Sequence, residues 1–385
     1  MSAATVTGAL RRFLPEFLNS NPPLSQQQRR AIWAITHCRT PALGGRSFAC
    51  ERCGQVHFAF HSCNHKACPQ CGREATARWI DRELGKLVGA PYFLVTFTLP
   101  SQLRGCFFGP FAKEAYDMFF AASSEALAEK LAAAKGLRAP ISGFTAVLHT
   151  WNQRMEFHPH LHFLIPGAGL DVRGKVVRVR QADYLVRLPH LQAAFRQHMR
   201  RQFEPRGWHA DPQVWIKDWG VHIQPAGSGA AALKYLGAYV ARTAISDGRI
   251  FAVDQRGVTF RWKDRSDHNR SKVMTLTGSE FVCHYLRHVL PSGLRSIRYY
   301  GFCHPAAKAK RQRIQIHTGM PFELNSRPSP DAAPSGAAPW PRCPTCHSPM
   351  RLTGSILPPY TTLVRQRGPP APKRRRNQAI SSVLP

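Results

Sequence analysis

The stretch FHPHLHFLIPGAGL, residues 157–170, alternates histidines with bulky apolar residues. Side chains at every second position share one face of a β-strand, so the histidines face one way and the apolar residues the other. The stretch therefore predicts a strand with a hydrophobic core on one side and a row of imidazoles on the other. The histidines are His158, His160 and His162, and the apolar residues are Leu161, Phe163 and Ile165.

The surrounding sequence predicts an α+β fold. GFTAVLHTWNQRM (143–155) reads as a strand that forms an antiparallel hairpin with the histidine strand, and PYFLVTFTLP (91–100) reads as a buried strand rich in β-branched and aromatic residues. Amphipathic or capped patterns predict several helices among these strands. The expected helices lie at 24–40, 73–88, 111–134 (one or two helices), after Pro189, at 227–243 and at 278–291.

Two imidazoles on one strand face suit a divalent ion such as Mn²⁺. We expect His160 and His162 to be two of its ligands, with a third from the neighbouring strand. Gln153, seven residues before His160, is the expected third ligand, and His149 and Glu156 are the other candidates. Two histidines and a neutral oxygen would leave open coordination positions, which favours metal-assisted catalysis over a structural role.

Tyr235 and Tyr239 are four residues apart on a predicted helix and therefore share a face. Aromatic residues at this spacing often belong to a core. A tyrosine hydroxyl needs a polar partner, however, and the helix already has a separate apolar side. That side consists of Leu233, Leu236 and Val240.

Three basic residues are expected to contact DNA. Lys234 and Arg242 flank the tyrosine pair, as phosphate-binding residues should. Lys263 lies on a predicted short strand, GVTFRWKD (257–264).

Two CxxC pairs predict a structural zinc site. Cys50 and Cys53 are followed, after 14 intervening residues, by Cys68 and Cys71. Four thiolates complete a closed tetrahedral zinc site, and a redox CxxC would not come in two copies. Other residues that could build a second site or substitute as ligands are Cys38, Cys63, His37, His61 and His65.

A third pair, Cys343 and Cys346, follows a Pro/Ala/Ser-rich stretch at 326–341. It is half of a zinc site. Either these are two thiols of a disordered tail, or another part of the chain completes the knuckle.

The charge of the chain favours a polyanionic partner. The 385 residues include 53 Lys and Arg against 22 Asp and Glu, which gives a formal charge of +31. Basic residues recur along the whole chain, and counterion release rewards such a distribution on nucleic acid. An anionic membrane surface is the weaker alternative, since no basic amphipathic helix dominates. We see no signal peptide and no apolar stretch long enough to cross a bilayer, so we expect a cytoplasmic, nucleoid-associated protein without a membrane partner.

Three motifs in order carry a resemblance to a known family. FTLP (97–100), HPHLH (158–162) and Tyr-x3-Tyr (235–239) resemble the motifs of HUH endonucleases of the rolling-circle class. The wider run through LKYLGAYVARTAIS, VTFRWKD and IRYYGF resembles the two-tyrosine rolling-circle insertion-sequence transposases. So does CRTPALGG with the cysteine-rich segment after it, which resembles their zinc-binding domain. The resemblance covers residues 38–302 and implies that His160 and His162 are metal ligands and that Tyr235 and Tyr239 are nucleophiles.

The resemblance implies an HUH domain with a central antiparallel sheet flanked by helices, preceded by a helical and zinc-ribbon DNA-binding domain. It implies Mg²⁺ or Mn²⁺ at the histidines, a structural Zn²⁺, and a transposase that nicks and rejoins single-stranded DNA at element ends through 5′-phosphotyrosine intermediates. A replication initiator, a relaxase and an inactive zinc-dependent DNA-binding protein are the alternatives. The expected division is a helical region at 1–36, a zinc domain at 37–90, the catalytic domain at 91–305 and a flexible, basic, Pro-rich tail at 306–385.

Overall fold

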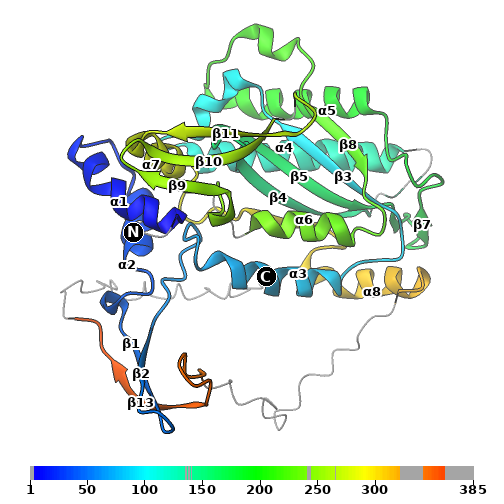
Figure 1. Ribbon diagram of the computed structural model, residues 1–385. Coiled ribbons are helices and arrows are strands. Elements are labelled where there is room, and N and C mark those ends of the chain that lie inside the picture. The colour runs from blue at the N-terminus through cyan, green and yellow to red at the C-terminus, as the bar shows by residue number, and fades with distance from the viewer. Residues whose placement is uncertain are drawn as a thin grey trace, which may run out of the picture.

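A five-stranded antiparallel sheet forms the centre of the molecule (Figure 1). The computed structural model describes residues 4–134, 137, 139, 141–240, 244–264, 266–320 and 341–359, without the side chains of 73–75 and 238–240. The strand order is β12-β4-β5-β3-β8, and β4 and β5 form the predicted hairpin. The strands are β3 (Tyr92–Thr98), β4 (Gly143–Trp151), β5 (Phe157–Pro166), β8 (Val221–Pro225) and β12 (Ile297–Gly301).

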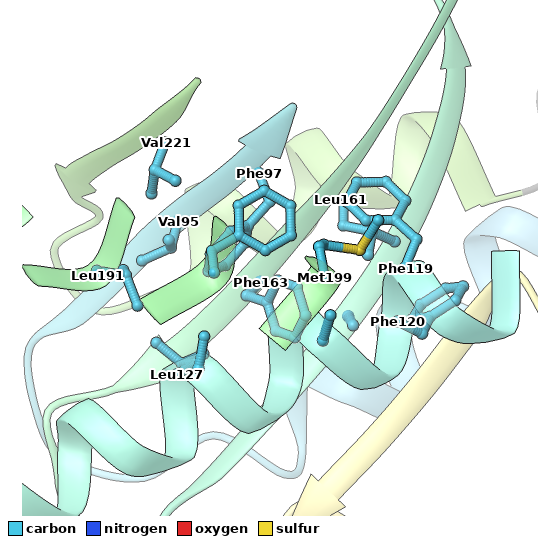
Figure 2. Packing of buried hydrophobic residues seen from close by; sticks show 14 of the residues in the cluster. Val95, Phe97, Phe119, Phe120, Leu127, Leu161, Phe163, Leu191, Met199 and Val221 are labelled. Carbon is cyan, nitrogen blue, oxygen red and sulfur yellow. The ribbon is translucent and has the colours of Figure 1, made fainter. Parts of the chain in front are cut away.

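One face of this sheet is covered by helices α4 (Ala112–Ala133) and α5 (Leu188–Phe203). The aromatic rings of the strands and helices interlock there, as Figure 2 shows for residues of β3, β5 and α4. The ring of Phe97 lies edge-on to those of Phe163 and Phe195, with centroids 5.3 and 4.9 Å apart. Such contacts stabilise a core beyond the area they bury. Because this face holds every second residue of β3, β4 and β5, the intervening residues must face the other way.

The opposite face carries α6 (Ala230–Val240), which packs against α3 (Gly72–Leu84). Leu233 and Leu236 of α6 are buried there with Leu164 of β5. Gly237 allows the two helices to approach closely, because a Cβ atom at this position would lie 2.3 Å from Cγ1 of Ile80. The position of α6 on the sheet is thus fixed by its apolar side and by one glycine.

A second cluster of buried residues joins the N-terminal helices to the chain's later part. Helix α1 packs on α7, and a three-stranded sheet of order β11-β10-β9 packs beside them (Figure 1). The elements are α1 (Val6–Asn19), α2 (Gln26–His37), β9 (Ile250–Asp254), β10 (Gly257–Asp264), β11 (Arg270–Leu276) and α7 (Gly278–Arg287).

A third sheet combines the two ends of the chain. Strand β1 lies between β2 and β13, antiparallel to both, and Figure 1 shows this sheet standing away from the central one. Strands β6 and β7 form a two-stranded sheet directly after β5, and helix α8 contacts β6. The bounds are β1 (Gly45–Cys50), β2 (Val56–Phe60), β6 (Ala168–Leu170), β7 (Val176–Arg178), α8 (Lys308–His317) and β13 (Met350–Ile356).

The α+β class and the central antiparallel sheet flanked by helices are confirmed. Helix α8 and strand β13 lie within residues 306–385, the segment expected to be a flexible, basic, Pro-rich tail. Both elements contact parts of the chain that are distant in sequence, so the local sequence pattern did not predict them. The division into four segments stays a prediction. In the part of the chain that the structure describes, no helix is both long and apolar enough to span a bilayer.

Candidate active site and cysteine clusters

Three histidines converge on the α6 side of the central sheet. His160 and His162 come from β5, and His149 of β4 lies directly opposite His160 in the strand register. One ligand nitrogen from each ring lies within 4.8 Å of the others. The intervening residue Leu161 is fully buried on the other face of the sheet. The structure thus brings together both predicted histidines and His149, which was one of the candidates for the third position.

Two of the imidazoles are oriented by hydrogen bonds at Nδ1. The Nδ1 atom of His160 is 2.7 Å from the carbonyl oxygen of His158. A carbonyl can only accept, so Nδ1 carries the proton and Nε2 presents its lone pair. The Nδ1 atom of His162 is 2.8 Å from Oγ1 of Thr96 on β3. Such bonds are the typical outer partners of metal-binding histidines, because they fix the ring and its tautomer.

His149 is also held in a form suited to metal binding. Burial lowers its pKa well below the ordinary value, and the neighbouring His162 and His160 lower it further. The ring is therefore neutral at physiological pH, and a neutral imidazole is the form that binds a metal ion.

Gln153, the expected third ligand, lies in the turn between β4 and β5 and not on a strand. Its side chain lines the same cavity as the histidines, and its amide oxygen accepts a hydrogen bond from the backbone N–H of Lys263 at 3.5 Å. Its backbone carbonyl accepts from the guanidinium of Arg249. Coordination by Gln153 stays a prediction.

Glu156, the remaining candidate for the third position, and the nearby His158 both have other partners. Glu156 accepts a hydrogen bond from the side-chain amide of Asn152 at 2.7 Å and pairs with Arg154. His158 accepts a hydrogen bond at Nδ1 from Arg104 at 2.8 Å. Neither residue belongs to the three-histidine group among the described residues.

Asn152 builds the turn and was not expected to have a role. Its Oδ1 atom accepts the backbone N–H groups of Arg154 at 2.9 Å and Glu156 at 3.0 Å. Asparagine commonly forms such turns, so its residue type was the feature of the sequence that could have predicted this role. This turn determines which residue of β4 lies opposite His160.

The histidines form part of the wall of a cavity of about 1270 Å³ between the central sheet, α6 and β10. Tyr235 reaches into it from α6: its side chain is 39% exposed, and its ring centroid lies 6.1 Å from that of His162. Leu233 and Leu236 face the opposite way, into the core. A core role therefore does not describe Tyr235. Tyr239 lies one helical turn further along α6, and its side chain is outside the described part of the structure.

The three residues expected to bind DNA differ from one another in their positions relative to the cavity. Lys263 lines the cavity from β10, whereas Lys234 is exposed on α6 and is not among the residues that line the cavity. Arg242 lies outside the described residues. Trp262, the neighbour of Lys263 on β10, also lines the cavity and has cations over its ring: Arg154 at 5.7 Å and Lys272 at 6.0 Å from the ring centroid.

The four cysteines expected to share one zinc ion are separated in the structure. Cys68 and Cys71 group with Cys38 and Cys63, and this set is called cluster 1. Its sulfurs lie within 4.8 Å of one another, with Cys71 at 3.5 Å from Cys38 and 3.6 Å from Cys63. The single-site grouping is therefore wrong. Strands β1 and β2 form a hairpin with Cys50 and Cys53 at its turn, whereas the cysteines of cluster 1 lie beyond the other end of the hairpin.

Cluster 1 is connected to the cavity through α3. Cys71 is the residue immediately before this helix, and α3 packs against α6, which carries Tyr235. The sequence named Cys38 and Cys63 only as residues that could build a second site or replace a ligand of the first. Their residue type was the one feature of the sequence that pointed to them. His37, His61 and His65 belong to no such group among the described residues.

The other pair, Cys50 and Cys53, groups with Cys343 and Cys346 of the C-terminal segment. This set is called cluster 2. Its four sulfurs also lie within 4.8 Å of one another. The CPTC cysteines thus lie beside a CxxC pair from another part of the chain, which is the arrangement that one of the two expectations requires.

Two protein-family models match the chain. Residues 9–99 match the family described as "Transposase zinc-binding domain", and residues 143–312 match the family described as "Putative transposase". The chain is 36% identical over 330 residues to "Putative transposase y4qJ" of Sinorhizobium fredii, which covers 78% of this chain and 80% of the relative. It is 28% identical over 284 residues to "Transposase for insertion sequence element IS801" of Pseudomonas savastanoi pv. phaseolicola, which covers 69% and 67%. No solved structure matches.

Proposed function

Because the chain belongs to the IS91 family of transposases, with that family's N-terminal zinc-binding domain, we propose that it nicks and rejoins single-stranded DNA through tyrosine nucleophiles. In the nicking step the phenolic oxygen forms a bond to phosphorus while the bond from phosphorus to the 3′ oxygen breaks. The products are a 5′-phosphotyrosine and a free 3′-OH, and the tyrosine's proton leaves with the 3′ oxygen. Attack by another 3′-OH reverses the step and rejoins the strand without ATP.

The observation that carries this proposal is the position of Tyr235 beside His162 in one open cavity. A nucleophile must be accessible to its substrate and close to the groups that stabilise the transition state. Tyr235 is partly exposed and lies on the wall that also holds the three histidines. Tyr239, four residues further along the same helix, is the proposed second nucleophile for the other DNA end.

The histidine cluster fits a divalent cation. His149, His160 and His162 each offer one ring nitrogen within 4.8 Å of the others, and two of the rings are oriented by Nδ1 hydrogen bonds. We propose these residues as the ligands of Mg²⁺ or Mn²⁺, with Gln153 as the alternative to His149. When bound, the ion neutralises charge on the non-bridging oxygens of the scissile phosphate.

Basic and aromatic residues around the cavity supply the proposed binding surface for DNA. Lys263 and Lys234 would contact phosphates, as would Arg242. Trp262 offers a flat ring on which a base can stack, and stacking is tolerant of sequence. Cluster 1 would hold a structural Zn²⁺ that keeps α3 in place behind α6. The protein would act in the cytoplasm, on DNA of the nucleoid.

A replication initiator or a relaxase would use the same tyrosine chemistry. The transposase relatives favour element ends as the substrate. An inactive DNA-binding protein would form no covalent product, so the assay below separates it from the three enzymes.

The test uses labelled single-stranded oligonucleotides tiled across the DNA that flanks the gene. With Mn²⁺ or Mg²⁺, the wild-type protein should form a protein–DNA adduct that survives denaturing electrophoresis. Tyr235→Phe and Tyr239→Phe remove one hydroxyl each, so each single variant should retain partial activity, and the double variant should form no adduct. Tyr184→Phe is the control, because Tyr184 is exposed away from the cavity. An adduct formed by the double variant would falsify the tyrosine assignment.

A further inference from the structure

Cluster 2 joins two parts of the chain that are 290 residues apart. The sulfur of Cys53 lies 3.5 Å from that of Cys343 and 3.6 Å from that of Cys346, and Cys50 lies 3.5 Å from Cys346. These distances are far longer than the ~2.05 Å of a disulfide bond. They are close to the ~3.8 Å that separates neighbouring sulfurs around a tetrahedral zinc ion with Zn–S bonds of ~2.3 Å.

The two CxxC turns have the same backbone structure. In each turn, the residue after the second cysteine donates its N–H to the carbonyl of the first, at 2.9 Å from Gly54 to Cys50 and from His347 to Cys343. That residue has a positive φ in both turns, +71° for Gly54 and +57° for His347. For a histidine this is an uncommon conformation, so the turn is held by its surroundings. Two matching turns that face each other are the arrangement of a zinc ribbon.

The first cysteine of each turn is fixed in the same way as well. The backbone N–H of Cys50 donates to the carbonyl of Gln55, and that of Cys343 donates to the carbonyl of Ser348, both at 2.9 Å. Each turn leads from or into a strand of the same sheet, since Cys50 ends β1 and pairs with Met350 at the start of β13. The register of β1 and β13 therefore places the four sulfurs together.

The sheet around cluster 2 lacks a hydrophobic core large enough to hold it. Among the residues that the structure describes, its buried apolar cluster contains only Phe48, Cys50, Cys343 and Met350. Val56 and Phe58 of β2 are about half exposed, at 49% and 53%. Small sheets of this kind are usually held by a metal ion or disulfides, because burial alone does not offset the entropy of ordering the chain.

We propose that Cys50, Cys53, Cys343 and Cys346 bind a second structural Zn²⁺, which ties the C-terminal segment to the N-terminal zinc-binding domain. The site is separate from cluster 1, and two of its ligands lie outside both family matches, which cover 9–99 and 143–312. Four thiolates leave no open position, so the ion is structural. The domain called N-terminal is thus built from both ends of the chain.

Zinc counting on the full-length protein tests this proposal. After extensive dialysis, the wild type should retain two zinc ions per chain, measured by mass spectrometry of the element. The double variant Cys343→Ser/Cys346→Ser should retain one, and so should Cys50→Ser/Cys53→Ser. The quadruple variant that combines them should also retain one, because all four residues serve one ion. The control Cys106→Ser/Cys283→Ser changes cysteines outside both clusters and should retain two.

A wild-type protein with only one zinc ion, or a Cys343→Ser/Cys346→Ser variant that keeps two, would overturn the proposal. A second measurement does not depend on how well the variants fold. A protease site introduced within 321–340 allows a chain with all eight cluster cysteines intact to be purified and then cut before Cys343. The fragment from residue 341 onward should co-elute with the rest of the protein in zinc and separate from it after chelation. Separation while the larger piece still holds two zinc ions would contradict the proposal.

The zinc count does not depend on the proposal that the protein nicks DNA. Tyr235→Phe and His160→Ala leave all eight cluster cysteines unchanged and should retain two zinc ions. A loss of zinc in the Cys343→Ser/Cys346→Ser variant therefore reports on cluster 2 alone, and an absent DNA adduct reports on the histidine and tyrosine site alone.

Discussion

The rings of Tyr235 and His162 meet almost at right angles, with an interplanar angle of 82° and centroids 6.1 Å apart. The two residues come from α6 and β5, so their distance depends on how α6 lies on the sheet. Leu233 and Leu236 fix the rotation of the helix by burying its other side. Gly237 fixes its distance from α3, because there is no room for a side chain against Ile80.

A larger residue at Gly237 should therefore disturb the site without touching it. We expect Gly237→Val to destabilise the protein by about 1–3 kcal/mol through overpacking. The yield of DNA adduct per folded molecule should fall, because α6 must move to accept the side chain. The matched control is Ala128→Gly, at an exposed position of α4 outside the cavity, which should cost about 1 kcal/mol of helix propensity and leave the adduct yield unchanged. Thermal unfolding and the adduct assay measure the two effects, and equal losses of adduct in both variants would contradict this account.

The identity of the third metal ligand can be decided with Mn²⁺. If His149 is a ligand, His149→Ala should weaken Mn²⁺ binding by at least ~10-fold, and Gln153→Ala should change it little. The reverse order would make Gln153 the ligand. The signal of free Mn²⁺ in electron paramagnetic resonance gives both affinities directly. His158→Ala is the control, because His158 lines the cavity outside the three-histidine group.

Trp262 should contribute to DNA binding through base stacking. Stacking of one base on an aromatic ring is worth about 1–3 kcal/mol, so Trp262→Ala should weaken binding of a single-stranded oligonucleotide by roughly 5- to 150-fold. Tyr184→Ala removes an exposed aromatic ring outside the cavity and should leave the affinity within a factor of two or so. Fluorescence anisotropy at one fixed salt concentration provides the comparison. Equal affinities for the wild type and Trp262→Ala would show that DNA does not pass over this ring.

His288 should make stability fall with acid. Burial lowers the pKa of His288 to about 4, against an unfolded value near ~6.5. Between these values the unfolded chain binds the proton more readily, so the free energy of unfolding decreases as the pH falls from about 6.5 toward 4. His288→Gln should show a smaller drop in melting temperature between pH 7 and pH 5 than the wild type. The control His209→Gln changes an exposed histidine and should follow the wild type; a parallel pH curve for His288→Gln would contradict the assignment.

The sequence alone determined the directions of side chains within each element. Alternation at period two placed His160 and His162 on one face of a strand and Leu161 on the other. Helical spacing placed Tyr235 opposite Leu233 and Leu236. These features depend only on the local backbone geometry of a strand or a helix, which is the same wherever the element lies in the fold.

Only the tertiary structure decided which elements meet. His149 lies opposite His160 because Asn152 closes the turn in one register, and a slip of one residue would have turned β4 over. Cys50 and Cys53 were paired with the nearest CxxC in the sequence, whereas the fold pairs them with Cys343 and Cys346. The spacing of cysteines along the chain does not predict such a contact. The entropic cost of closing a loop rises only slowly with its length, so a distant CxxC pair is hardly disfavoured against a near one. The register between β1 and β13 selects the partner instead.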